Sequence, residues 1–138
     1  KLDELKTMND TMYHRGPNDS GEELFDAGND YQLGLAQRRL SILDLSMLGH
    51  QPMHSCNDRL IIVYNGEIYN FLELKKELSD YPFKSNCDTE VILKGFAKWG
   101  IEVAKRLNGI FAFAIYEEKR KKDKERKRRG IDQITYYW

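Results

Sequence analysis

An apolar run that ends at an Asn-Gly pair constrains the fold of this chain most strongly. Residues 60–63 read Leu-Ile-Ile-Val, and residues 64–70 read Tyr-Asn-Gly-Glu-Ile-Tyr-Asn. Four consecutive apolar residues predict a strand that is buried on both faces. Asn-Gly is a strong hairpin signal. Glycine also permits close approach of a ligand, so the Asn65 side chain and the Gly66 N–H are alternatively the two donors of an oxyanion hole at the strand's end.

Hydrophobic periodicity along the rest of the chain predicts an α+β fold. Apolar residues at helical spacing predict helices over 2–12, 71–78, 89–99 and 103–107. Alternating or continuous apolar residues predict strands over 22–25, 31–36, 60–64 and 110–116. Loops or turns are expected at 14–21, 28–30 and 46–54. Asp88 stands where the helix 89–99 needs an N-cap, and Gly100 stands where that helix should stop.

The length and composition of the chain predict a single domain without a membrane-spanning segment. The chain has 138 residues, of which 41% are hydrophobic, enough for one core. No apolar run approaches the roughly 20 residues that span a bilayer, and the charged first residues do not resemble a secretory signal. The two cysteines, Cys56 and Cys87, form neither a zinc-ligand spacing nor a disulfide framework. A reducing, cytoplasmic setting is therefore expected.

The net charge of zero hides an uneven distribution. Residues 119–138 hold nine basic and three acidic residues, most of them in the run 119–129. Such a run can contact nucleic acid, but it is more often a solvated segment. No aromatic residue interrupts the run to stack on bases. Nucleic acid is therefore not expected as the main partner.

Three further motifs change the interpretation of the Asn-Gly pair. They read His-Arg-Gly-Pro-Asn-Asp-Ser-Gly at 14–21, Gln-Arg-Arg-Leu-Ser-Ile-Leu-Asp at 37–44 and Cys-Asp-Thr-Glu-Val-Ile-Leu at 87–93. In this order, and with residues 64–70, they resemble the glutamine amidotransferase domain of the asparagine synthetase family, a class II domain with an N-terminal nucleophile. The resemblance covers about 14–116. It implies a four-layer αββα sandwich of antiparallel sheets, the Ntn-hydrolase type, whose first strand is apparently missing here.

The resemblance also implies a site for L-glutamine. Arginine suits the α-carboxylate because its planar fork binds carboxylates with two hydrogen bonds, and acidic residues suit the α-ammonium. Without the family context, Arg39 could be a surface cation and Asp88 only a helix cap. By resemblance, Arg39 binds the carboxylate, Leu40, Ser41, Ile42 and Leu43 line the pocket, Asp88 and Glu67 hold the amino group, and Asn65 and Gly66 form the oxyanion hole.

Other implications concern cofactors and partners. The resemblance implies no cofactor in this domain, and it assigns ATP and Mg only to a synthetase domain that is absent from this chain. That C-terminal domain is the implied partner, a homodimer is compatible with the family, and aspartate is the default acceptor of the ammonia.

The chain departs from the family at both ends. The family nucleophile is a cysteine at the mature N-terminus, whose α-amino group acts as the base, whereas this sequence starts at Lys1. Cys56 and Cys87 cannot supply such an amine, so both are interpreted as structural, and the chain is expected to be a piece of a longer protein. Near the other end, charged residues at 123–127 replace an apolar strand, which predicts that this segment is exposed, helical or disordered. The expected organisation is an amidotransferase domain over 1–118 and an atypical segment over 119–138.

Three functions follow in order of preference. The first is a glutaminase domain that supplies ammonia to an ATP-dependent synthetase domain. The second is a glutamine-binding regulatory module without catalysis. The third is nucleic-acid binding through the run 119–129.

Overall fold

The chain forms an α+β structure with two antiparallel sheets, as the sequence predicts. The computed structural model describes residues 1–28, 30–40, 47–118 and 133–137. The α-helices are α1 (Leu2–Asp10), α2 (Phe71–Glu77) and α3 (Asp88–Trp99), and three 3-10 helices are η1 (Tyr13–Arg15), η2 (Met47–Gly49) and η3 (Gly100–Arg106). The strands are β1 (Asp19–Gly28), β2 (Tyr31–Arg39), β3 (Met53–His54), β4 (Leu60–Ile68), β5 (Gly109–Glu117) and β6 (Gln133–Tyr137).

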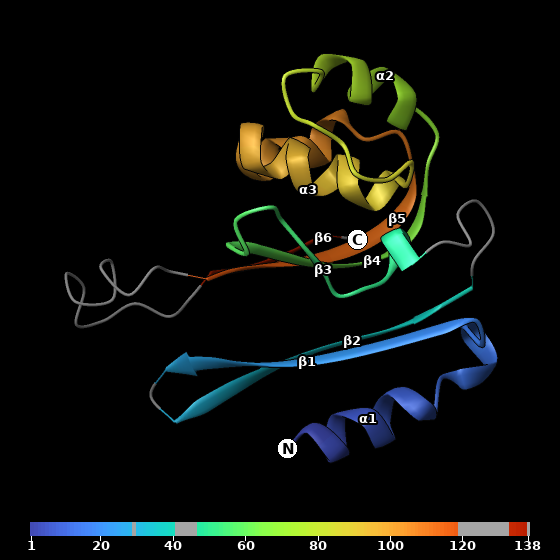
Figure 1. Ribbon diagram of the computed structural model, residues 1–138, viewed down its shortest axis with the longest axis vertical. Coiled ribbons are helices and arrows are strands. Elements are labelled where there is room, and N and C mark those ends of the chain that lie inside the picture. Colours follow the sequence, from blue (N-terminus) through green and yellow to red (C-terminus); the bar gives the residue numbers. More distant parts are fainter. Residues whose placement is uncertain (29, 41–46, 119–132, 138) are drawn as a thin grey trace.

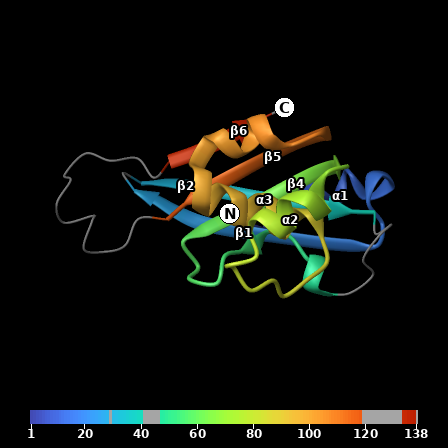
Figure 2. The same ribbon diagram turned by 90° about the horizontal axis from the view of Figure 1, so that it is seen from above.

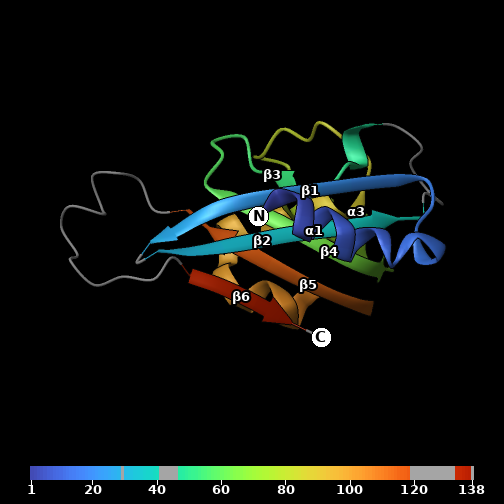
Figure 3. The ribbon, with the colours of Figure 1, turned by 90° about the horizontal axis from the view of Figure 1, so that it is seen from below.

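The two sheets lie face to face between helices. Strands β1 and β2 form a hairpin, and the second sheet has the order β3-β4-β5-β6 with every neighbour antiparallel. In Figure 1, helix α1 lies below the hairpin, and α2 and α3 lie above the four-stranded sheet. The view from above shows α2 and α3 over the larger sheet (Figure 2), and the view from below shows α1 across β1 and β2 (Figure 3). The hairpin therefore has one face for α1 and the other for the larger sheet.

Strand β4 is buried on both faces, as its apolar run predicts. Ile62 and Tyr64 face α2 and α3 and belong to the larger hydrophobic core. Ile61 belongs to a smaller core between the sheets, with Leu35 of β2 and Tyr116 of β5. Ile61 and Ile62 are both 0% exposed. Burying side chains of this size contributes roughly 1.5–3 kcal/mol each, so this strand is held firmly up to the Asn-Gly pair.

The hairpin interpretation of Asn65-Gly66 is wrong. Strand β4 continues through both residues to Ile68, and Gly66 lies opposite Phe111 in unbroken register with β5. Gly66 has φ 145°, in the region that favours glycine. A Cβ placed there would lie 2.3 Å from the carbonyl oxygen of Ile110. Pairing with β5 therefore overrides the local turn signal.

Other elements differ from their predicted bounds. Strand β1 is longer than the predicted 22–25, because the whole of 19–28 pairs with β2. Strand β3 lies within the predicted loop 46–54, and the predicted helix 103–107 overlaps the second half of the 3-10 helix η3, which ends at Arg106. The helix stop at Gly100 is confirmed, since α3 ends at Trp99 and Gly100 has φ 59°.

The C-terminal part contains a strand that periodicity does not predict. Strand β6 pairs with β5, with Phe113 opposite Tyr137 and Glu117 opposite Gln133. The charged residues 123–127 and the basic run 119–129 lie outside the described residues. Within the described part of the chain, no helix is long and apolar enough to cross a membrane.

Candidate functional site: a cavity where strand β4 extends past β3

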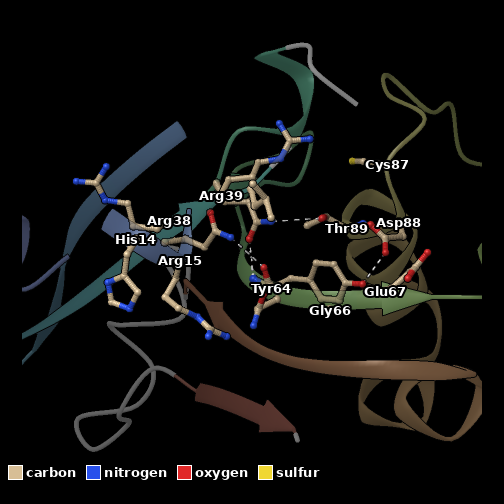
Figure 4. Close-up of a pocket in the computed structure, with 14 residues that line it drawn as sticks. His14, Arg15, Arg38, Arg39, Tyr64, Gly66, Glu67, Cys87, Asp88 and Thr89 are labelled. Carbon is tan, nitrogen blue, oxygen red and sulfur yellow. Dashed lines mark hydrogen bonds between the residues drawn. The ribbon is translucent and has the colours of Figure 1, made fainter. Parts of the chain in front are cut away.

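A cavity of about 500 Å³ opens where strand β4 extends beyond its short neighbour β3. It brings together residues from η1, the end of β2, the second half of β4 and the start of α3 (Figure 4). The lining residues are His14, Arg15, Gln37, Arg38, Arg39, Leu40, Gln51, Tyr64, Asn65, Gly66, Glu67, Cys87, Asp88 and Thr89.

One group of lining residues is cationic. Arg39 ends β2, and its guanidinium lies against Gly49, where a Cβ would be only 2.3 Å from an Arg39 nitrogen. Because Gly49 has no side chain, the Arg39 guanidinium can occupy the space beside it. Arg38 beside it is paired with Asp10 and stacks on the Tyr13 ring at 5.3 Å. Helix α1 and η1 thus hold Arg38, while Arg39 lies at the end of β2 beside Gly49.

Acidic residues from two other elements line the same cavity. Glu67 is an exposed residue of β4, and Asp88 is the first residue of α3. A carboxylate at a helix N-terminus is favoured by the helix dipole. Since the cavity carries both cations and carboxylates, it suits a small molecule with both charges, such as a free amino acid.

Asp88 is held by three hydrogen bonds from the protein. Its Oδ2 accepts one from the Tyr64 hydroxyl at 2.5 Å and one from the Ile68 N–H at 3.2 Å, and its Oδ1 accepts one from the Thr89 N–H at 3.0 Å. Burial, together with the bond to Asp88, raises the pKa of Tyr64 well above its ordinary value, so the hydroxyl remains a donor. The carboxylate therefore has a fixed orientation.

The prediction that Asp88 caps the helix is wrong. Helix α3 begins at Asp88 itself, the N-cap residue is Cys87, and no side chain makes a capping hydrogen bond. Two of the three bonds to Asp88 come from β4, because Tyr64 and Ile68 lie beside the helix N-terminus. Asp88 thus ties α3 to β4 while it lines the cavity.

Six predicted site residues line this same cavity: Arg39, Leu40, Asn65, Gly66, Glu67 and Asp88. Leu40 is 56% exposed. The other three predicted residues, Ser41, Ile42 and Leu43, lie outside the described residues. Gln51 and Tyr64 are lining residues with no predicted role. No local pattern marks them, because their importance comes from contacts across the sheets.

The two cysteines differ in their surroundings. Cys56 is exposed in the turn before β4, whereas Cys87 is buried and lines the cavity. The Cys87 sulfur lies 2.9 Å from the Ser85 hydroxyl. In the part of the chain that the structure describes, no group of three or more His, Cys, Asp or Glu side chains is arranged to hold a metal ion.

Fold and site together define a domain of antiparallel sheets and helices with a cavity lined by both cationic and acidic side chains. The chain belongs to the glutamine amidotransferase domain family, whose model matches residues 1–137. The match includes strand β6, beyond the 14–116 covered by the resemblance in the motifs.

Relatives of the chain are much longer proteins. A Methanocaldococcus jannaschii protein described as an asparagine synthetase (glutamine-hydrolyzing) is 41% identical over 99% of this chain and 29% of its own length. Amidase chry2 of Gibberella zeae is 35% identical over 98% of this chain and 20% of its own length. Asparagine synthetase (glutamine-hydrolyzing) 1 of Bacillus subtilis is 39% identical over 83% of this chain and 17% of its own length. The chain thus spans less than a third of each of these relatives.

Proposed function

We propose that this domain binds L-glutamine in the cavity and supports hydrolysis of the side-chain amide, which provides ammonia to an ATP-dependent synthetase domain of a longer parent protein. The observation that carries the proposal is that Asn65 and Gly66 line the same cavity as a cation, Arg39, and two carboxylates, Glu67 and Asp88. Membership of the glutamine amidotransferase family supports glutamine as the ligand. Aspartate is the proposed acceptor in the parent protein, in line with the names of two relatives.

Each end of glutamine has a proposed partner. Arg39 binds the α-carboxylate, because a guanidinium matches a carboxylate with two parallel hydrogen bonds. Asp88 and Glu67 bind the α-ammonium. The side-chain amide then lies at Asn65 and Gly66, whose side-chain and backbone N–H groups stabilise the oxyanion.

The proposed chemistry follows the family's N-terminal cysteine. Its thiolate attacks the side-chain carbonyl carbon, and the carbonyl electron pair moves to the oxygen that Asn65 and Gly66 hold. The carbon–nitrogen bond then breaks, the nitrogen leaves as ammonia after taking up a proton, and water hydrolyses the thioester to glutamate. Neither Cys56 nor Cys87 is the proposed nucleophile, because an internal cysteine has no free α-amino group. The proposed architecture is the four-layer αββα sandwich of Ntn hydrolases, and the proposed location is the cytoplasm.

The test restores the nucleophile. A Cys-Gly-Ile strand is added ahead of Lys1, and ammonia release from glutamine is measured for this protein and for a version with Ala in place of the added cysteine. We expect release only with the cysteine. In that protein Asn65→Ala should lower kcat by about 10²–10³, the usual cost of one oxyanion donor. Exposed Asn57→Ala, in the turn before β4, serves as the matched control. Full turnover in Asn65→Ala would place the oxyanion hole elsewhere, and glutamine binding without turnover would favour a regulatory module.

A further inference from the structure

Two buried or half-buried glutamines, Gln51 and Gln37, bind the backbone of the residue that precedes the Asn-Gly pair. The Tyr64 N–H donates to Gln51 Oε1 at 2.6 Å, and the Tyr64 carbonyl accepts from Gln37 Nε2 at 3.3 Å. Gln51 also donates to the Thr89 hydroxyl at 3.4 Å. Figure 4 shows Tyr64 at the centre of these contacts, with Thr89 and Asp88 on α3 beside it.

The register of β3 explains why a side chain takes this place. Met53 lies opposite Ile62 and His54 opposite Ile61. Continued by two residues, this register would put Gln51 opposite Tyr64. Pro52 has no N–H to donate to a neighbouring strand, and β3 begins only at the next residue, Met53. The side-chain amide of Gln51 replaces the missing strand as the partner of the Tyr64 N–H.

The alternation of a strand extends this arrangement to Gly66. The N–H groups of residues 64, 66 and 68 point to the same side of β4, because neighbouring residues alternate. On that side the Tyr64 N–H is bound by Gln51, and the Ile68 N–H is bound by Asp88 at 3.2 Å. The Gly66 N–H therefore faces the cavity between two N–H groups that side chains hold in place.

We propose that Gln51 and Gln37 are positioning residues that fix β4 at Tyr64 and thereby aim the Gly66 N–H and the Asn65 amide at the side-chain carbonyl of the ligand. This inference rests on the proposed binding of glutamine. Gln51 is 4% exposed. Removing its side-chain amide would leave the Tyr64 N–H without its partner, and a buried donor without a hydrogen bond destabilises the local structure. The two glutamines come from different elements, so they hold Tyr64 from the loop before β3 and from the opposite sheet.

The test compares two ligands on the 138-residue chain by calorimetric titration. L-Norvaline has the same α-carboxylate and α-ammonium groups as L-glutamine but ends in a methyl group instead of an amide. The ratio of the two Kd values therefore reports the contacts of the side-chain amide group. In Gln51→Leu we expect the preference for glutamine to fall about five-fold, the equivalent of one neutral hydrogen bond. The Kd for norvaline should stay within about two-fold, because Arg39 and Asp88 are untouched.

Gln37→Leu provides a second variant in case Gln51→Leu does not fold, since Gln37 is only partly buried. It should lower the same preference in the same direction. Gln32→Leu is the matched control, because Gln32 is an exposed glutamine on the same strand β2.

The outcomes separate this inference from the proposed function. An unchanged preference in both variants would overturn the positioning role while leaving glutamine binding intact. An equal loss for both ligands would also overturn it, since that result indicates general loosening of the site. If the unaltered chain binds neither ligand, or binds both equally, the proposed function itself fails and the positioning role fails with it.

Discussion

Replacing Asp88 by asparagine should weaken glutamine binding and leave the domain folded. Asparagine has the shape of aspartate but one acceptor oxygen instead of two. With that oxygen at the Oδ2 position, it keeps the bonds from Tyr64 and Ile68 and loses the bond from the Thr89 N–H. Losing one hydrogen bond to a charged carboxylate costs about 1.5–3 kcal/mol, below the 5–15 kcal/mol that typically stabilises a domain. The variant should therefore be folded at 25 °C.

The expected loss of affinity is similar in free energy to the loss of stability, and it appears directly in the Kd. A hydrogen bond to a charged partner is worth about 1.5–3 kcal/mol, so removing the charge at residue 88 should raise the Kd for glutamine about ten- to a hundred-fold. The loss should depend on the α-ammonium. For 4-carbamoylbutanoate, which is glutamine without its α-amino group, Asp88→Asn should change the Kd by less than about three-fold.

Isothermal titration calorimetry measures these values, and thermal unfolding followed by circular dichroism checks the fold. The matched experiment at the other end uses Arg39→Ala with glutamine α-amide, whose carboxylate is blocked. Arg39→Ala should raise the Kd for glutamine, but it should change the Kd for glutamine α-amide very little. If Asp88→Asn weakens both ligands equally, or weakens neither, Asp88 does not bind the α-ammonium and only links α3 to β4.

Two further substitutions test the surroundings of the site. Gly49→Ala should weaken glutamine binding severalfold without unfolding the domain, because the new methyl group displaces the Arg39 guanidinium; titration should find no added loss in an Arg39→Ala background. Glu90→Gln should lower the free energy of unfolding by about 2 kcal/mol at pH 7, measured by urea denaturation. Burial raises the pKa of Glu90, but the Ser85 hydroxyl, two backbone N–H groups and Lys94 together hold it below its ordinary value of 4.5. This stabilisation is present above pH 4.5 and is lost as the pH falls below 4.5 toward the folded-state pKa of Glu90. The difference in the free energy of unfolding between wild type and Glu90→Gln should therefore shrink below pH 4.5. A difference that stays constant with pH would refute this role of Glu90.

The elements with strong periodicity could be predicted from the residues alone. The run Leu60–Val63 predicts a strand buried on both faces, and Ile61 and Ile62 confirm it. The Asn-Gly pair misleads because hairpin propensity is local, whereas the actual backbone of Gly66 is set by Phe111 on β5. Strand β6 could not be predicted, because its short sequence pairs only with a strand that is already in place.

The site depended on the resemblance more than on residue patterns. No spacing rule brings Arg39 and Asp88 to one cavity. Arg39 ends strand β2 of the hairpin, whereas Asp88 begins helix α3, which packs on the other sheet. Patterns favour Asp88 as a helix cap, but the structure binds it to Tyr64 instead, because β4 passes beside the start of α3. No sequence pattern predicts a role for Gln51, because its contact with Tyr64 depends on the register of the two-residue strand β3.

The difference in length between β3 and β4 connects the fold to the proposed chemistry. An exposed strand edge presents backbone N–H groups that would pair with any other strand. Here side chains bind the N–H groups of Tyr64 and Ile68 at that edge, and from the alternation of the strand we infer that the Gly66 N–H between them faces the cavity. A side chain at residue 66 cannot be accommodated, because a Cβ would lie 2.3 Å from the Ile110 carbonyl oxygen. In our proposal the donor at Gly66 is held both by the pairing of β4 with β5 and by the side chains that bind this edge, so the proposed oxyanion hole would need no rearrangement when charge develops.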